Sequence, residues 1–121
     1  MKIRHISIID DDPASLLLMQ EILGDHFETT VFQDARSFFQ KFNEMNTDLV
    51  VTDLMMPDIP GFDIIKKIRT DMPDMPVIVV SATDDETVIK KAYQMGITAY
   101  FRKPLNTGLL KDTLLHPSLN N

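Results

Sequence analysis

The chain has 121 residues, of which 44% are hydrophobic and none is cysteine, and its formal net charge at pH 7 is −6. This length and apolar content predict one compact domain over residues 1–121, and the absence of thiols excludes a disulfide framework and a thiolate metal site. The negative charge disfavours binding to nucleic acid or to an anionic membrane. No apolar stretch approaches the roughly 20 residues that span a bilayer, so we expect a soluble, cytoplasmic protein.

Short β-branched runs alternate along the chain with longer stretches of helical period, which is the pattern of βα units around a parallel sheet. The predicted strands are HISII (5–9), TTVF (29–32), DLVVT (48–52), PVIVVS (76–81) and TAYFR (98–102). The first, third and fourth runs are almost continuously apolar, as central strands covered on both faces are, and the other two are more polar. The sequence therefore predicts an α/β fold with a doubly wound, five-stranded parallel sheet.

Five helices are predicted between and after these strands, each with a start or stop signal. They are residues 14–23 before Gly24, a helix after Asp34 that carries Phe38, Phe39, Phe42 and Met45, residues 61–71, a helix between Asp84 or Asp85 and Gly96, and a short last helix from Asn106 that Pro117 stops near Leu115. In the third helix, Ile64, Ile65 and Ile68 are predicted to face the core.

Polar residues follow the ends of several predicted strands. They are Asp10, Asp11 and Asp12 after the first strand, Asp53 after the third, Ser81 at the end of the fourth, and Lys103 with Pro104 after the fifth. Parallel strands carry their C-terminal ends to the same edge of a sheet, and ligands bind in the crevice there. If the first strand lies between the second and the third, the acidic cluster and Asp53 become neighbours.

Three carboxylates in one crevice repel one another and raise one another's pKa values, which costs folding free energy unless a cation is bound. Asp12 precedes Pro13 and is better explained as a helix N-cap. A site with few carboxylates and room for water suits Mg²⁺. A carboxylate beside such an ion can attack phosphorus and form an aspartyl phosphate, and Asp53, which stands alone at its strand end, is the better candidate.

Ser81 and Lys103 add the groups that a transferred phosphoryl group needs. A hydroxyl can donate to one phosphoryl oxygen and an ammonium can neutralise another. Taken singly, a serine at a strand end is more often a turn residue, and a lysine before proline is usually a solvated loop charge. Their joint placement at one sheet edge favours the phosphoryl-binding interpretation.

The motifs IIDDDP, DLMMPDIPG, VVSA and YFRKP occur in this order, with 28 residues from Asp53 to Ser81 and 22 from Ser81 to Lys103. Over essentially its whole length, the chain resembles the receiver domain of two-component response regulators. The resemblance implies a flavodoxin-like fold with strand order 2-1-3-4-5. It also implies that a sensor histidine kinase or a histidine phosphotransfer protein phosphorylates the domain, which then changes conformation and signals downstream without turning over external substrates.

The resemblance further implies that Asp10 and Asp11 form the acidic pair of a Mg²⁺ site, which Asp53 and the backbone carbonyl of Met55 complete. Asp53 would be the phosphoacceptor. Met56, next in the loop, is better explained as core filler than as part of the chemistry.

By the same resemblance, Ser81 would be the hydroxyl switch and Lys103 the phosphate-binding lysine, whose peptide bond to Pro104 is commonly cis in the family. Tyr100 looks like the aromatic switch residue. A half-buried aromatic on an edge strand is the alternative interpretation of Tyr100.

Two other functions compete with this one. Haloacid dehalogenase-like phosphatases use the motif Asp-x-Asp-x-Thr/Val, which Asp10 and Asp12 satisfy and Ala14 does not, and the chain has no room for their substrate-covering cap. A pseudo-receiver that acts only as a binding module is disfavoured because every candidate site residue is present. The tail, residues 116–121, could begin a linker to an output domain.

Overall fold

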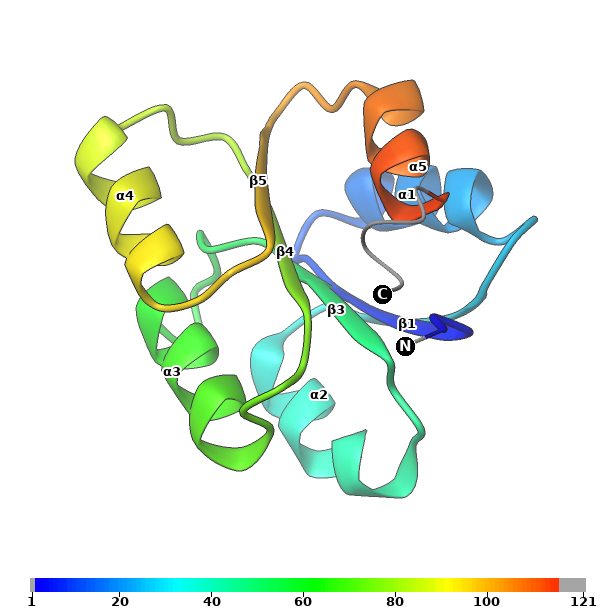
Figure 1. The fold of residues 1–121 in the computed structure, drawn as a ribbon, viewed down its shortest axis with the longest axis horizontal. Helices are drawn as coiled ribbons and strands as arrows, with labels where there is room; N and C mark the ends of the chain where they lie inside the picture. The colour runs from blue at the N-terminus through cyan, green and yellow to red at the C-terminus, as the bar shows by residue number, and fades with distance from the viewer. Residues whose placement is uncertain (1, 116–121) are drawn as a thin grey trace.

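The computed structural model describes residues 2–115, and over that range strands and helices alternate along the chain (Figure 1). The strands are β1 (His5–Ile9), β2 (Glu28–Phe32), β3 (Leu49–Thr52), β4 (Val77–Ser81) and β5 (Ala99–Arg102). The helices are α1 (Pro13–Leu23), α2 (Ala35–Lys41), α3 (Gly61–Asp71), α4 (Glu86–Gln94) and α5 (Thr107–Leu115), with a 3-10 turn, η1 (Phe42–Glu44), after α2. The predicted stop at Pro117 and the tail at 116–121 lie outside the described residues.

All strand pairs in the sheet are parallel, and the strand order is β2-β1-β3-β4-β5, which confirms the predicted doubly wound α/β fold. In the central pair, Ile9 of β1 lies opposite Thr52 of β3. The next residue along each strand is an aspartate, Asp10 or Asp53, so the register itself places the two carboxylates side by side.

The helices cover both faces of the sheet. Helices α1 and α5 lie on one face, and α2, α3 and α4 lie on the other (Figure 1). On the α3 side, Ile64, Ile65 and Ile68 are fully buried, as predicted from their spacing. Complete burial of an isoleucine side chain contributes about 1.5–3 kcal/mol, so these three residues hold α3 firmly against the sheet.

Side-chain caps begin four of the helices. The carboxylate of Asp12 accepts a hydrogen bond from the Ala14 N–H of α1, Asp34 caps α2, Asp85 caps α4, and the side chain of Asn106 accepts from the Leu109 N–H of α5. These caps satisfy backbone donors that a helix leaves unpaired at its N-terminus. The prediction that Asp12 is a cap is confirmed.

The second helix is shorter than predicted. It is α-helical only to Lys41, continues as η1, and leaves Met45 extended at the end of that turn. Asn43 and Asn46 have low helix propensity, while the ring of Phe42 still stacks on that of Phe38. The low helix propensity of these asparagines is consistent with the early end of the α-helix, and the contact between Phe38 and Phe42 is kept. Among residues 2–115, no helix is long and apolar enough to cross a membrane.

Gly61 opens α3 in close contact with the loop that follows β3. A Cβ added to Gly61 would lie 2.6 Å from the Leu54 Cβ and would also press on the Leu54 carbonyl oxygen. Leu54 is itself buried and directly follows Asp53. Gly61 therefore allows the chain to turn into α3 while the residue after Asp53 remains packed.

We expect Gly61→Ala to lower the free energy of unfolding by about 1–3 kcal/mol. The added methyl group would overlap the backbone of Leu54, and relief of this overlap requires a shift of one of the two backbone segments. Urea denaturation of parent and variant measures this change. Gly108→Ala is the matched control, since its added Cβ would have no neighbour closer than 3.6 Å in the exposed first turn of α5, and there alanine should stabilise by up to about 1 kcal/mol. Equal stability changes in the two variants would contradict the close contact at Gly61.

Candidate functional site

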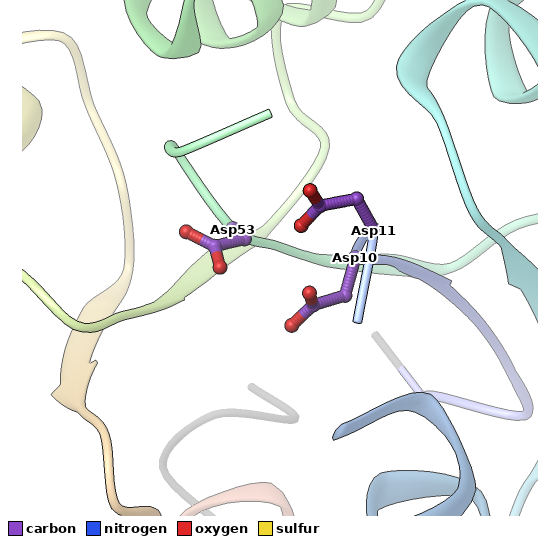
Figure 2. A group of neighbouring side chains, drawn as sticks. All are labelled: Asp10, Asp11 and Asp53. Carbon is purple, nitrogen blue, oxygen red and sulfur yellow. The ribbon is translucent and has the colours of Figure 1, made fainter. Parts of the chain in front are cut away.

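Three carboxylates gather at the C-terminal ends of β1 and β3. One oxygen from each of Asp10, Asp11 and Asp53 lies within 4.8 Å of the other two, and Figure 2 shows the three side chains together. Asp10 is fully buried, Asp53 is 4% exposed and Asp11 is exposed. The structure thus places together the three residues that the sequence analysis grouped, with Asp11 toward solvent.

Both carboxylate oxygens of Asp53 are held by hydrogen bonds. Its Oδ1 accepts the Met55 N–H at 2.9 Å, and its Oδ2 accepts from the Lys103 ammonium at 2.8 Å. Its backbone N–H donates to the Ile9 carbonyl oxygen at 3.0 Å, which continues the β1–β3 ladder past the end of β3. The side chain that we predicted as nucleophile therefore has a fixed direction, set by its own loop and by Lys103, the residue that follows β5.

Lys103 connects the two buried carboxylates. Its Nζ lies 2.8 Å from Asp10 Oδ2 and 2.8 Å from Asp53 Oδ2, and its backbone N–H donates to the Ser81 carbonyl oxygen. Burial lowers the pKa of Lys103, but the bonds and charges of the two aspartates outweigh burial, so its pKa is raised and it stays protonated. The Lys103–Pro104 peptide bond is cis, the geometry that the resemblance implies.

The repulsion expected among the carboxylates is partly offset by this ammonium group. Burial raises the pKa of Asp10, and the hydrogen bond from Lys103 reduces the rise. Three carboxylates at −1 each and one ammonium at +1 leave a formal charge of −2. Oxygen ligands with this residual charge, at mutual distances within 4.8 Å, fit a hard divalent cation such as Mg²⁺.

Ser81, at the end of β4, presents a buried hydroxyl that makes no hydrogen bond of normal geometry within residues 2–115, although it lies close enough to the Tyr100 hydroxyl to affect the pKa of that phenol. The residue has no exposed surface. A buried hydroxyl without a partner is costly and is rare in folded proteins. It is therefore available to a group that enters the site.

Tyr100 is half-buried on β5, and its hydroxyl donates to the Thr83 carbonyl oxygen at 2.9 Å. Burial raises the pKa of the Tyr100 phenol, and the neighbouring Ser81 hydroxyl lowers it in part. The Tyr100 hydroxyl thus lies beside the Ser81 hydroxyl while it donates to the loop after β4. Sequence reasoning identified Tyr100 but not its partner Thr83, because nothing in a turn sequence marks which carbonyl oxygen accepts a distant hydroxyl.

The loop after Asp53 is held by burial of one of its residues and by a hydrogen bond to α2. Met56 is buried, as predicted for core filler, whereas the Met55 side chain is 63% exposed. Asp58 Oδ2 accepts the Arg36 N–H of α2 at 3.0 Å. Sequence reasoning missed this role of Asp58, since an aspartate 22 residues away in the sequence gives no sign that it will cap α2. The loop is therefore positioned both by burial and by a cap on a neighbouring helix.

Residues 6–115 match the protein family described as the response regulator receiver domain. The two-component response regulator ARR2 of Arabidopsis thaliana is 30% identical over 93% of this chain, and the DNA-binding response regulator MtrA of Mycolicibacterium smegmatis is 29% identical over 84%. The chain spans 17% of the first relative's length and 44% of the second's.

Solved structures of receiver domains are also similar to this chain. A beryllofluoride-activated DrrB receiver domain has a TM-score of 0.88 at 26% identity, with all of both chains covered. A response regulator receiver domain protein from Clostridium thermocellum has a TM-score of 0.84 at 27% identity, with 98% of this chain and 99% of the other covered. Together with the acidic site at the end of β1 and β3, these likenesses show that the chain belongs to the response regulator receiver domain family.

Proposed function

We propose that residues 1–121 form a cytoplasmic phosphoacceptor domain in which Asp53 receives a phosphoryl group from a sensor histidine kinase or a histidine phosphotransfer protein. The observation that carries this proposal is the fixed Asp53 carboxylate, which is bonded through both oxygens and is paired with Lys103. It lies at the carboxyl edge of a doubly wound sheet, where ligands bind. The phosphorylated domain then signals through a changed surface to a partner or output domain.

In the proposed transfer, a carboxylate oxygen of Asp53 forms a bond to phosphorus while the bond from phosphorus to the donor's histidine nitrogen breaks. The electron pair of the broken bond stays on that nitrogen. Lys103 already contacts Asp53 and neutralises negative charge near the transferred group, and the free Ser81 hydroxyl donates to one of its oxygens. Lys103 and Ser81 are already positioned to stabilise the negative charge of the transferred group, so the site needs little rearrangement during the transfer.

The carboxylates of Asp10, Asp11 and Asp53 would hold Mg²⁺, with the Met55 carbonyl as the fourth protein ligand in this proposal. When bound, the ion supplies positive charge to the phosphoryl oxygens and to the carboxylates around them. The residual charge of −2 and the close spacing of the carboxylate oxygens support this assignment. Asp12 takes no part, since its carboxylate is used by the Ala14 N–H and the Ser15 hydroxyl.

The role of Asp12 also disfavours the dehalogenase-like alternative, which needs that residue as its second catalytic acid. Its carboxylate is committed to the first turn of α1. We propose that the domain performs its own phosphorylation and dephosphorylation and does not turn over external substrates. The closeness of the Asp10, Asp11 and Asp53 carboxylates to one another and of Lys103 to Asp53 supports phosphoryl transfer over the pseudo-receiver alternative.

A phosphodonor has a suitable docking surface next to this crevice. An apolar pocket of about 290 Å³ lies between α1 and the loop after β5, lined in part by Leu18, Met19, Pro104 and Leu105, and Lys103 lies at its border with the site. Leu18 is also 42% exposed on α1. We propose that the donor protein places an apolar side chain here while its histidine approaches Asp53.

Asp53→Asn should abolish the phosphoryl adduct that a small phosphodonor forms with the parent in the presence of Mg²⁺, because the amide is not a nucleophile toward phosphorus. Intact-protein mass spectrometry detects the adduct, and hydroxylamine should remove it. Asp71→Asn is the control, since that carboxylate belongs to an exposed pair with Lys67 on α3 and its loss should leave the adduct unchanged. Modification of Asp53→Asn at the parental rate would identify a different nucleophile.

Mg²⁺ should raise the melting temperature of the parent, because a ligand that binds only the folded state adds about 2.7 kcal/mol of stability at 100 times its dissociation constant. Asp11→Asn should gain much less from Mg²⁺, since it removes the exposed carboxylate of the group. In chelator the variant should melt at the parental temperature or slightly above it, because one like charge is gone.

Four thermal melts, of parent and Asp11→Asn with chelator and with Mg²⁺, measure both effects. If the variant is less stable in chelator and still gains fully from Mg²⁺, Asp11 is a structural residue and the metal site lies elsewhere.

A further inference from the structure

An open groove of about 340 Å³ lies between α2, α3 and the loop that leads into α3, which are neighbours on one face of the sheet (Figure 1). Its lining is formed by Arg36, Phe39 and Gln40 of α2, Ile59 of the loop and Lys67 of α3. None of these residues belongs to the carboxylate site or to the proposed docking surface on α1. The groove is therefore a part of the surface to which the proposed phosphoryl transfer gives no role.

The floor of the groove is apolar and fixed in position. Phe39 and Ile59 are half-buried and pack against the core on the α3 side of the sheet. The Phe39 ring also contacts the buried Phe38 ring edge to face, with 5.1 Å between the ring centroids. A floor that is already ordered offers contact area at a low entropic cost on binding. Single exposed apolar side chains are common on protein surfaces, so the floor alone does not indicate a partner.

The charged residues of the groove do indicate one, because both are cations. The Lys67 ammonium lies 5.2 Å from the centroid of the Phe39 ring, above the floor. Its ion pair with Asp71, at 3.6 Å, is exposed on both sides, and such pairs contribute little and exchange readily. The guanidinium of Arg36 forms no ion pair within the part of the chain that the structure describes. Two cations are thus available beside an apolar floor.

This lining contrasts with the domain as a whole. The formal net charge is −6, yet no acidic residue lines the groove. At physiological salt the Debye length is about 8 Å, so a ligand in the groove experiences mainly the nearest charges. A short segment with few carboxylates is attracted by Arg36 and Lys67, whereas a nucleic acid, which extends over the acidic remainder, is repelled.

A second copy of this chain fits the groove poorly. A symmetric contact places the same surface of both copies together, and here it would bring the Arg36 and Lys67 side chains of one copy against those of the other. Like charges across an interface disfavour association. The complementary occupant is therefore a different surface, one that carries carboxylates and an apolar side chain.

We propose that the groove between α2 and α3 binds an acidic segment of a partner protein. Carboxylates of that segment pair with Arg36 and Lys67, and an apolar side chain between them packs on Phe39 and Ile59. The proposal is independent of the proposed phosphoacceptor function, because it requires neither Asp53 nor a metal ion.

A capped synthetic peptide tests the proposal, with one leucine flanked on each side by aspartate and glutamate. Titration into the isotopically labelled protein, followed by NMR, should shift the amide signals of the five residues that line the groove. A counterpart peptide with asparagine and glutamine should bind at least about two- to fivefold more weakly, which is the effect of one exposed ion pair. Added salt should weaken the binding of the acidic peptide only.

Arg36→Gln and Lys67→Gln should each weaken binding of the acidic peptide by about two- to fivefold. Both side chains are exposed, so the fold should be retained. Lys66→Gln is the matched control, because it makes the same change of charge at an exposed position of α3 outside the groove. Asp53→Asn should bind the peptide as the parent does, and its result separates this proposal from the proposed function.

Three results would overturn the proposal. The first is that the peptide leaves the signals of the groove residues unchanged. The second is that Lys66→Gln weakens binding as much as Lys67→Gln, which would show a response to net charge alone. The third is that the groove signals shift with protein concentration in the absence of peptide, which would assign the groove to a second copy. Peptide binding in a parent protein that forms no phosphoryl adduct would overturn the proposed function and leave this proposal standing.

Discussion

A single ammonium group, that of Lys103, pairs with two carboxylates that the fold withdraws from water. Asp10 has no exposed surface and Asp53 has 4%, and each accepts from Lys103 at 2.8 Å. A buried carboxylate without a partner costs several kcal/mol. The bridge therefore makes it possible to place a reactive carboxylate at the centre of the sheet edge, and it ties together the chain segments that follow β1, β3 and β5.

The proposed phosphorylation of Asp53 would also change this bridge. Phosphorylation would replace the Asp53 carboxylate by a larger group that carries more negative charge, so the pairing of Lys103 and the free hydroxyl of Ser81 must both change. The central strands cannot yield, because their apolar residues are almost completely buried. In the proposed switch, the adjustment falls instead on the loop between β4 and α4 and on α4, whose nine residues include one that is buried, Ala92.

This division between a rigid and an adjustable half follows from packing. Helix α3 buries three isoleucines, and the loop before it is fixed by Gly61 against Leu54 and by Asp58 on α2. Helix α4 has one buried alanine, the Tyr93 hydroxyl at its end accepts the Tyr100 N–H, and the Tyr100 hydroxyl donates to the loop before it. A local charge event biases an element most easily when that element has low stability of its own. The proposed phosphoacceptor, Asp53, thus lies on the more deeply packed side of the domain, and α4 lies on the less deeply packed side.

The spacing of apolar residues was sufficient to predict the strands, the sheet class and the inward face of α3. An element that buries one face must repeat apolar residues at its own structural period, and that repeat can be read in the sequence. The aspartate and asparagine caps could also be predicted, because a cap depends only on the residue next to the start of a helix. The end of the second helix was predicted too late, since it stops as an α-helix at Lys41. Which carboxylates meet was visible only through the rule that parallel strands share an edge. The Ile9–Thr52 register, the double pairing of Lys103, the cap from Asp58 and the bond from Tyr93 to an edge-strand N–H were decided by tertiary structure. Each depends on distances between residues far apart in the chain, and no local pattern encodes those distances.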